Sequence, residues 1–155
     1  QVPVIDDDGI VLSESAAILV YLAKKSGRLI PQDPAGEAQV IRWCFAATNT
    51  LEVPLLARQV IGWFDKSASS IAKKTLTEWA QRHLANLDPW LASREFVAVD
   101  QFTIADILMT HVIGVEAEAE LLAPYAHVRA YLDRCHARPA WHRAHDAYCA
   151  RVEAA

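Results

Sequence analysis

Apolar residues recur along most of the chain at the three- and four-residue spacing of helices that bury one face. Five such stripes follow residue 37: Val40, Trp43, Cys44, Ala47 and Leu51; Leu76, Trp79, Ala80, His83, Leu84, Leu87 and Leu91; Ile104, Ile107, Leu108, His111, Val112 and Val115; Tyr125, Val128, Leu132 and Cys135; and Trp141, Ala144, His145, Tyr148, Cys149 and Val152. One apolar face per helix predicts a helical bundle over residues 37–155. Pro54 should kink or interrupt the first of these helices, because proline lacks the N–H of a helix interior.

The first 27 residues follow a different pattern. Two short β-branched runs, at residues 2–5 and 10–12, flank the sequence Asp6-Asp7-Asp8-Gly9. An Asp-Gly pair between two such runs predicts a hairpin. An apolar stretch over residues 16–23 then predicts a helix, with lysines in its last turn and Gly27 as its stop.

Residues 28–36 contain two prolines and a glycine and have no periodicity, so they predict a linker. The chain therefore divides into residues 1–27, a linker at 28–36, and a helical domain at 37–155. Its fold class is mainly α, since only the hairpin reads as strand.

Composition excludes several classes of protein. A formal net charge of -4 argues against a broad nucleic-acid-binding face, and no apolar run is long enough for a membrane span. The chain has three cysteines, whereas a disulfide framework normally has a larger, even number. This count indicates a reducing, intracellular setting. No secretory leader is visible at the start of the sequence.

One helix start is specified in detail. Thr103 can cap the helix that begins after it, and the Asp106 carboxylate, three residues on, can accept from the Thr103 N–H. We expect this capping box to be structural, without a chemical role.

A second helix start carries candidate chemistry. Glu14 and Ser15 precede the first predicted helix, and a helix amino end is a ready anion site because its first N–H groups are unpaired. Taken alone, this pattern is more typical of capping. Pro3, at the start of a strand, likewise has a simple structural reading, since it costs no ladder hydrogen bond there.

Four fragments, in order and at matching spacing, together resemble the glutathione transferase family. They are Val2-Pro3-Val4; Glu14-Ser15-Ala16-Ala17-Ile18 with Tyr21-Leu22; Phe102-Thr103-Ile104-Ala105-Asp106; and Arg138-Pro139-Ala140-Trp141. The resemblance implies a thioredoxin-like domain followed by an all-helical domain. It further implies that residues 1–27 are only the last hairpin and helix of the first domain, and that its opening half, with the residue that activates the thiol, is missing.

The resemblance implies a function and a set of site residues. The expected activity is conjugation of the glutathione thiolate to an electrophilic, apolar small molecule, as in detoxification, with glutathione as substrate and no cofactor. The peptide bond before Pro3 would be cis, so that the backbone of Val2 pairs with the cysteinyl part of glutathione. Glu14 and Ser15 would hold the γ-glutamyl end. A cytoplasmic homodimer is implied, with no nucleic-acid or membrane partner and no catalytic residue in this chain.

Aromatic residues on the first helix of the bundle suggest a second-substrate pocket. Trp43 and Asn49 are its first candidates, with Arg42, Phe45, Trp63 and Phe64 as further neighbours. His136, His142, His145, Cys135 and Cys149 lack the spacing of a zinc site, so no metal is expected. Cys44 lies on an apolar stripe and is expected to be an inert buried thiol.

Two other readings stay open. One is a different glutathione-dependent enzyme on the same scaffold, such as a reductase, dehalogenase or isomerase. The other is a non-catalytic binding or interaction protein, because the same fold also serves in translation-factor subunits and regulators. The residue that activates the thiol would distinguish the enzymes, and retention on glutathione would distinguish an enzyme from an interaction module.

Overall fold

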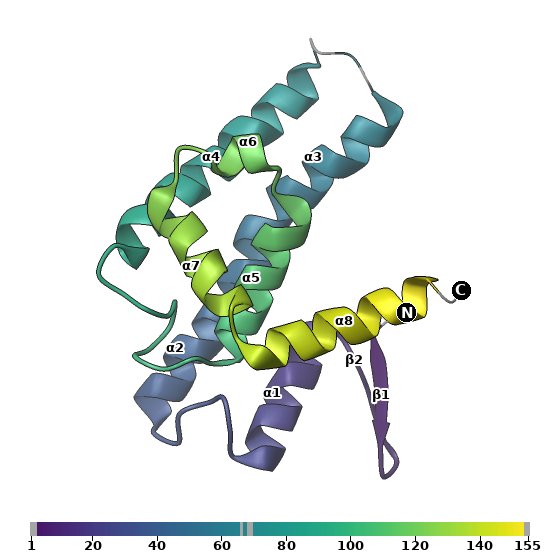
Figure 1. The fold of residues 1–155 in the computed structure, drawn as a ribbon, viewed down its shortest axis with the longest axis vertical. Helices are drawn as coiled ribbons and strands as arrows, with labels where there is room; N and C mark the ends of the chain where they lie inside the picture. Colours follow the sequence, from purple (N-terminus) through teal and green to yellow (C-terminus); the bar gives the residue numbers. More distant parts are fainter. Residues whose placement is uncertain (1–2, 66, 68–69, 154–155) are drawn as a thin grey trace.

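The computed structural model describes residues 3–65, 67 and 70–153, and it consists of a β-hairpin followed by helices (Figure 1). The elements, in chain order, are β1 (Val4–Asp7), β2 (Ile10–Ser13), α1 (Ser15–Ser26), α2 (Pro34–Phe45), the π-helical segment η1 (Ala46–Leu51), α3 (Glu52–Phe64), α4 (Ile71–Leu91), α5 (Ile104–Glu116), α6 (Ala119–Leu122), α7 (Ala126–His136) and α8 (Pro139–Glu153). The predicted mainly helical fold is confirmed. None of the described helices is both long and apolar enough to cross a bilayer.

The hairpin forms where the Asp-Gly pair predicts it. β1 and β2 are antiparallel, and the turn contains Asp8 and Gly9 at positive φ values of 52° and 87°. The N–H of Gly9 donates to Asp6 Oδ1 at 3.0 Å and closes the turn. Helix α1 follows directly and ends at Gly27, whose φ of 65° is the left-handed conformation that glycine adopts readily.

The predicted linker is three residues too long. Residues 34–36 form the first turn of α2, with Asp33 as its cap accepting from the Gly36 N–H at 2.8 Å. Pro34 occupies the first helical position, where its missing N–H costs nothing and its fixed φ suits a helix. The prolines therefore mark a helix start as well as a connection.

Helices α2 and α3 form one long rod joined by η1 (Figure 1). The interruption predicted for Pro54 is present as this π-helical segment, which ends just before α3. Pro54 lies in the first turn of α3 and cannot donate to the carbonyl four residues back, so widening of the preceding turn accommodates it.

The core of the helical domain surrounds α5, which packs against α2, η1, α3 and α7. Its buried side chains are Ile104, Ala105, Leu108, Met109, Val112 and Ile113. The predicted first stripe is also buried, from Val40 to Leu51. These faces meet in one continuous apolar cluster, as one apolar face per helix requires.

The predicted capping box is present at the start of α5. Asp106 is fully buried, and its carboxylate accepts from the N–H and hydroxyl of Thr103 at 2.8 and 3.2 Å. It also accepts from the Val97 N–H at 2.8 Å and from the Tyr131 hydroxyl at 2.9 Å. Burial raises the pKa of Asp106, while these four hydrogen bonds act in the opposite direction. The carboxylate therefore joins α5, α7 and the loop before α5.

The apolar stripe predicted for α8 is not buried. Tyr148 and Val152 are 67% and 57% exposed, and α8 contains no buried residue within the described chain. Its start is held to α7 by Trp141, whose ring stacks on those of His136 and His145, each at 4.6 Å between centroids. Helical spacing predicted the helix correctly, but spacing alone does not show whether another element covers its apolar face.

Candidate functional site

The chain turns sharply where the hairpin meets α1. Glu14 joins β2 to the helix with φ 71° and ψ 116°, a positive φ that residues other than glycine adopt rarely. Its carbonyl accepts the first helical hydrogen bond, from the Ile18 N–H, at 2.9 Å. Glu14 and Ser15 are both exposed. A strained backbone at an exposed helix start is typical of ligand-binding positions.

The amino end of α1 offers hydrogen-bond donors to an anion. The first N–H groups of a helix have no intrahelical partner, and the Glu14 side chain makes no capping hydrogen bond to them. The helix dipole favours negative charge at this end, and the Ser15 hydroxyl adds one more donor. The adjacent Glu14 carboxylate favours a cation. The arrangement therefore suits a ligand that carries a carboxylate and an ammonium group together.

The hairpin register brings the start of β1 to the same end of the hairpin. Val4 pairs with Ser13, so Pro3, which precedes Val4, and Glu14, which follows Ser13, lie at the same end of the hairpin. Pro3 is exposed there. Val2 lies outside the described residues, and with it the peptide bond that precedes Pro3. Pro3, Glu14 and Ser15, three of the four residues predicted to bind glutathione, therefore lie at one end of the hairpin.

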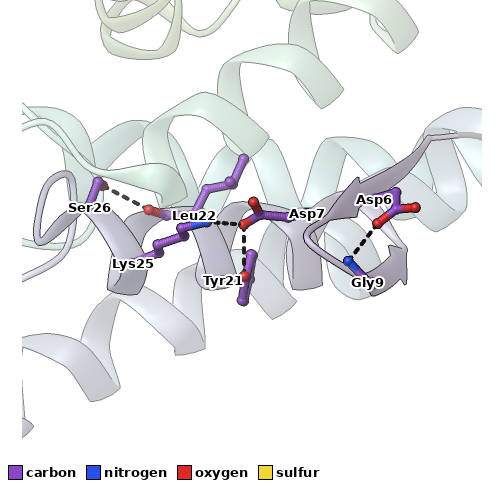
Figure 2. Close-up of polar contacts among 7 residues, drawn as sticks. All are labelled: Asp6, Asp7, Gly9, Tyr21, Leu22, Lys25 and Ser26. Carbon is purple, nitrogen blue, oxygen red and sulfur yellow. Dashed lines mark hydrogen bonds and ion pairs between the residues drawn. The ribbon is translucent and has the colours of Figure 1, made fainter.

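A polar cluster that we call the hairpin clamp (Asp7, Tyr21 and Lys25) ties the far end of β1 to α1 (Figure 2). Asp7 Oδ2 accepts from the Tyr21 hydroxyl at 2.8 Å and forms an ion pair with Lys25. Lys25 and then Tyr21 lower the pKa of Asp7, and the hydrogen bonds to Asp7 raise the pKa of both partners. Sequence reasoning missed this cluster. Its only signal was the four-residue spacing of Tyr21 and Lys25, which says nothing of Asp7.

A cavity of about 600 Å³ lies between the α2–η1 rod and α4. Trp43 and Asn49, the two predicted pocket residues, both line it. The Trp43 and Trp90 rings lie 5.3 Å apart, and the Arg42 guanidinium lies 4.9 Å from the Trp43 ring. Trp90 could not be predicted here, because it comes from a different helix more than forty residues away in the sequence.

One residue that lines the cavity and one that faces α1 lie on different sides of α2. Glu37 faces α1, because its carboxylate pairs with Lys24 Nζ at 2.6 Å. Arg42 follows five residues later, which at 3.6 residues per turn is about 140° around the helix. Arg42, which lines the cavity, therefore lies on a different side of α2 from Glu37.

The outer aromatic residues of the predicted pocket do not reach this cavity. Trp63 and Phe64 lie near the end of α3 and are 64% and 86% exposed. Trp63 and Phe64 share one continuous helical rod with Trp43. At a rise of 1.5 Å per residue, about thirty ångströms of helix separate residue 43 from residue 64.

The cysteines offer no reactive thiol in the core. Cys44 and Cys135 are buried, and burial raises their pKa values to about 11 and about 12. Cys149 is half-buried, with its Sγ 3.8 Å from His145, so these two side chains do not lie in the core as their stripe predicted. Among the described residues no three potential metal ligands form a group.

Comparison with known proteins identifies a family. The model of the glutathione S-transferase C-terminal domain matches residues 50–139. The disulfide-bond oxidoreductase YghU of Escherichia coli is 34% identical over 137 residues, which cover 82% of this chain and 47% of that protein. Glutathione S-transferase D7 of Anopheles gambiae is 32% identical over 140 residues, covering 86% of this chain and 62% of that protein.

Solved structures agree with this result. A glutathione transferase from Burkholderia graminis, crystallised with two glutathione molecules per subunit, superposes with a TM-score of 0.79 at 31% identity. The match covers 89% of this chain and 62% of that one. This chain therefore spans about half to two thirds of the length of these relatives.

Proposed function

Because the chain belongs to the glutathione S-transferase family, we propose that the full-length protein binds glutathione where the hairpin meets α1 and transfers its thiolate to an electrophilic, apolar small molecule. The observation that carries this proposal is the exposed amino end of α1, with Glu14 held at positive φ and Ser15 beside it. Structural neighbours crystallised with glutathione support the same substrate.

Each residue of this corner has a proposed contact with the tripeptide. The Ser15 hydroxyl and the first N–H groups of α1 bind the γ-glutamyl carboxylate, since donors at a helix amino end favour an anion. Glu14 attracts the γ-glutamyl ammonium group. The backbone of Val2, set by Pro3, pairs with the cysteinyl residue as an added strand does.

Activation of the thiol needs a group that we propose to lie outside the described residues. A glutathione thiolate forms at neutral pH only if a hydrogen bond or a positive charge lowers the thiol pKa. The buried Cys44 and Cys135 cannot take over as nucleophiles, because their raised pKa values keep them protonated at neutral pH. Following the family resemblance, we propose that the activating residue lies in a preceding part of the full-length protein.

A glutathione-dependent reductase is the second candidate, favoured by the likeness to the E. coli oxidoreductase. The two activities are distinguished by assaying the full-length protein with 1-chloro-2,4-dinitrobenzene and with 2-hydroxyethyl disulfide. A transferase forms the thioether and releases chloride, whereas a reductase oxidises two glutathione molecules to the disulfide for each disulfide reduced. Turnover of the disulfide alone would overturn the transferase assignment. Failure to bind immobilised glutathione, by a folded protein, would favour a non-catalytic interaction protein.

We propose that the cavity lined by Trp43 and Asn49 takes the electrophile. Trp43→Leu in the full-length protein should raise KM for the electrophile about fivefold, because one wall of the aromatic pair is lost. KM for glutathione should not change. Trp63→Leu is the matched control, since this indole is exposed outside the cavity.

Oligomeric state is measured on the same variants by sedimentation, because Arg42, which lines the cavity, lies on a different side of α2 from the residue that pairs with α1. An unchanged KM together with an altered sedimentation coefficient would assign the cavity to a contact between subunits instead.

Apolar side chains on α3 support the proposal of a homodimer. Val53 and Leu56 share one helix face and are 43% and 40% exposed. A cytoplasmic location is part of the same proposal.

A further inference from the structure

We propose that the hairpin clamp of Asp7, Tyr21 and Lys25 is a positioning device that fixes the direction of α1 relative to the hairpin at the glutathione-binding corner. This inference rests on the proposed function, because it assigns a role toward the same site. The clamp contacts the last residue of β1, Asp7, whereas Pro3 directly precedes the first residue of that strand and Ser15 is the first residue of α1.

The geometry of the corner needs a second point of attachment. Near the site, β2 passes directly into α1 through Glu14 at positive φ, while α1 itself packs against α2 and α5. A residue in this conformation relaxes unless the surrounding structure holds it. The clamp supplies such a hold from the other end, since Tyr21 and Lys25 bring the middle and last turns of α1 onto the Asp7 carboxylate.

The clamp constrains the direction of α1 more than it adds to stability. One carboxylate oxygen of Asp7 serves both partners, and the Lys25 ammonium lies 6.0 Å from the centre of the Tyr21 ring. Two bonds to one oxygen, from residues four apart on the helix, oppose both rotation and tilt of α1. Exposed ion pairs contribute little to stability, but binding sites need their donors aligned within about 10–20°. Loss of the clamp should therefore affect glutathione affinity more than folding.

The chain offers a matched control. Lys24 and Lys25 are neighbours in the last turn of α1, about equally exposed, and each forms one ion pair. Lys24 pairs with Glu37 of α2 and not with the hairpin. A purely structural role predicts similar effects of substitution at the two positions, whereas positioning of the corner predicts an effect at Lys25 alone.

The test is calorimetric titration of the full-length protein with glutathione. Lys25→Gln and Tyr21→Phe should each weaken binding about fivefold, the loss expected for one hydrogen bond. Lys25→Arg, which keeps the ion pair, should stay within about twofold of the wild type, and Lys24→Gln should bind as the wild type does. The melting temperatures of Lys24→Gln and Lys25→Gln should agree.

Equal affinities of Lys24→Gln and Lys25→Gln would overturn the positioning role while leaving the proposed function intact. A loss in Lys25→Arg as large as in Lys25→Gln would also overturn it. Failure of the wild type to bind glutathione would instead overturn the proposed function, and this inference with it.

Discussion

Replacing Asp106 by alanine is expected to lower the free energy of unfolding by about 4 kcal/mol, the largest effect of any substitution considered for this chain. The carboxylate is fully buried and accepts four hydrogen bonds, two of them from backbone N–H groups. Alanine would leave the N–H groups of Val97 and Thr103 buried without an acceptor. Urea unfolding of the full-length protein measures the change.

Tyr131→Phe is the control for this experiment. It removes one donor to Asp106 and leaves the backbone N–H groups bonded, so it should cost only about 1 kcal/mol. Equal costs for the two variants would contradict the view that Asp106 holds α5, α7 and the preceding loop together.

Ser15→Ala is expected to weaken glutathione binding by roughly 1–3 kcal/mol, the cost of leaving a charged acceptor without one donor. Folding should be unaffected, because the Ser15 side chain is exposed and the helix begins with Glu14 as its cap. Calorimetric titration of the full-length protein measures the affinity.

Ser13→Ala serves as the control, since this serine is also exposed but lies two residues earlier, on β2. Unchanged affinity in Ser15→Ala would remove Ser15 from the site and leave the backbone N–H groups as the only donors.

Local signals predicted the elements of this fold well. The Asp-Gly pair predicts the hairpin, Gly27 predicts the end of α1, and the spacing of Thr103 and Asp106 predicts the capping box. Each signal acts within a few residues, where backbone preferences and short-range hydrogen bonds decide the conformation.

Features that depend on distant residues could not be predicted in this way. The capping box gave no sign that Asp106 also accepts from Tyr131, which lies twenty-five residues further on. The apolar stripe of α8 did not indicate its exposure, because a helical period reports only that one face is apolar. Trp90 lines the cavity, and Asp7 pairs with Lys25, because separate elements pack together. Neither contact has a local signal in the sequence.

The binding corner falls between these two cases. Glu14 and Ser15 were recognisable as a helix start, but the positive φ of Glu14 and the position of Pro3 at the same end of the hairpin depend on the hairpin register. A shift of that register by one residue would turn every side chain of β1 to the opposite face. The site therefore needed the three-dimensional structure as well as the motif.

A crystal structure of the full-length protein with glutathione tests the central claim most directly. The γ-glutamyl carboxylate should lie within hydrogen-bond distance of the Ser15 hydroxyl and of the first N–H groups of α1. The peptide bond before Pro3 should be cis, with the cysteinyl backbone paired to Val2. Glutathione bound elsewhere, or a helix end filled by the protein's own side chains, would contradict the account.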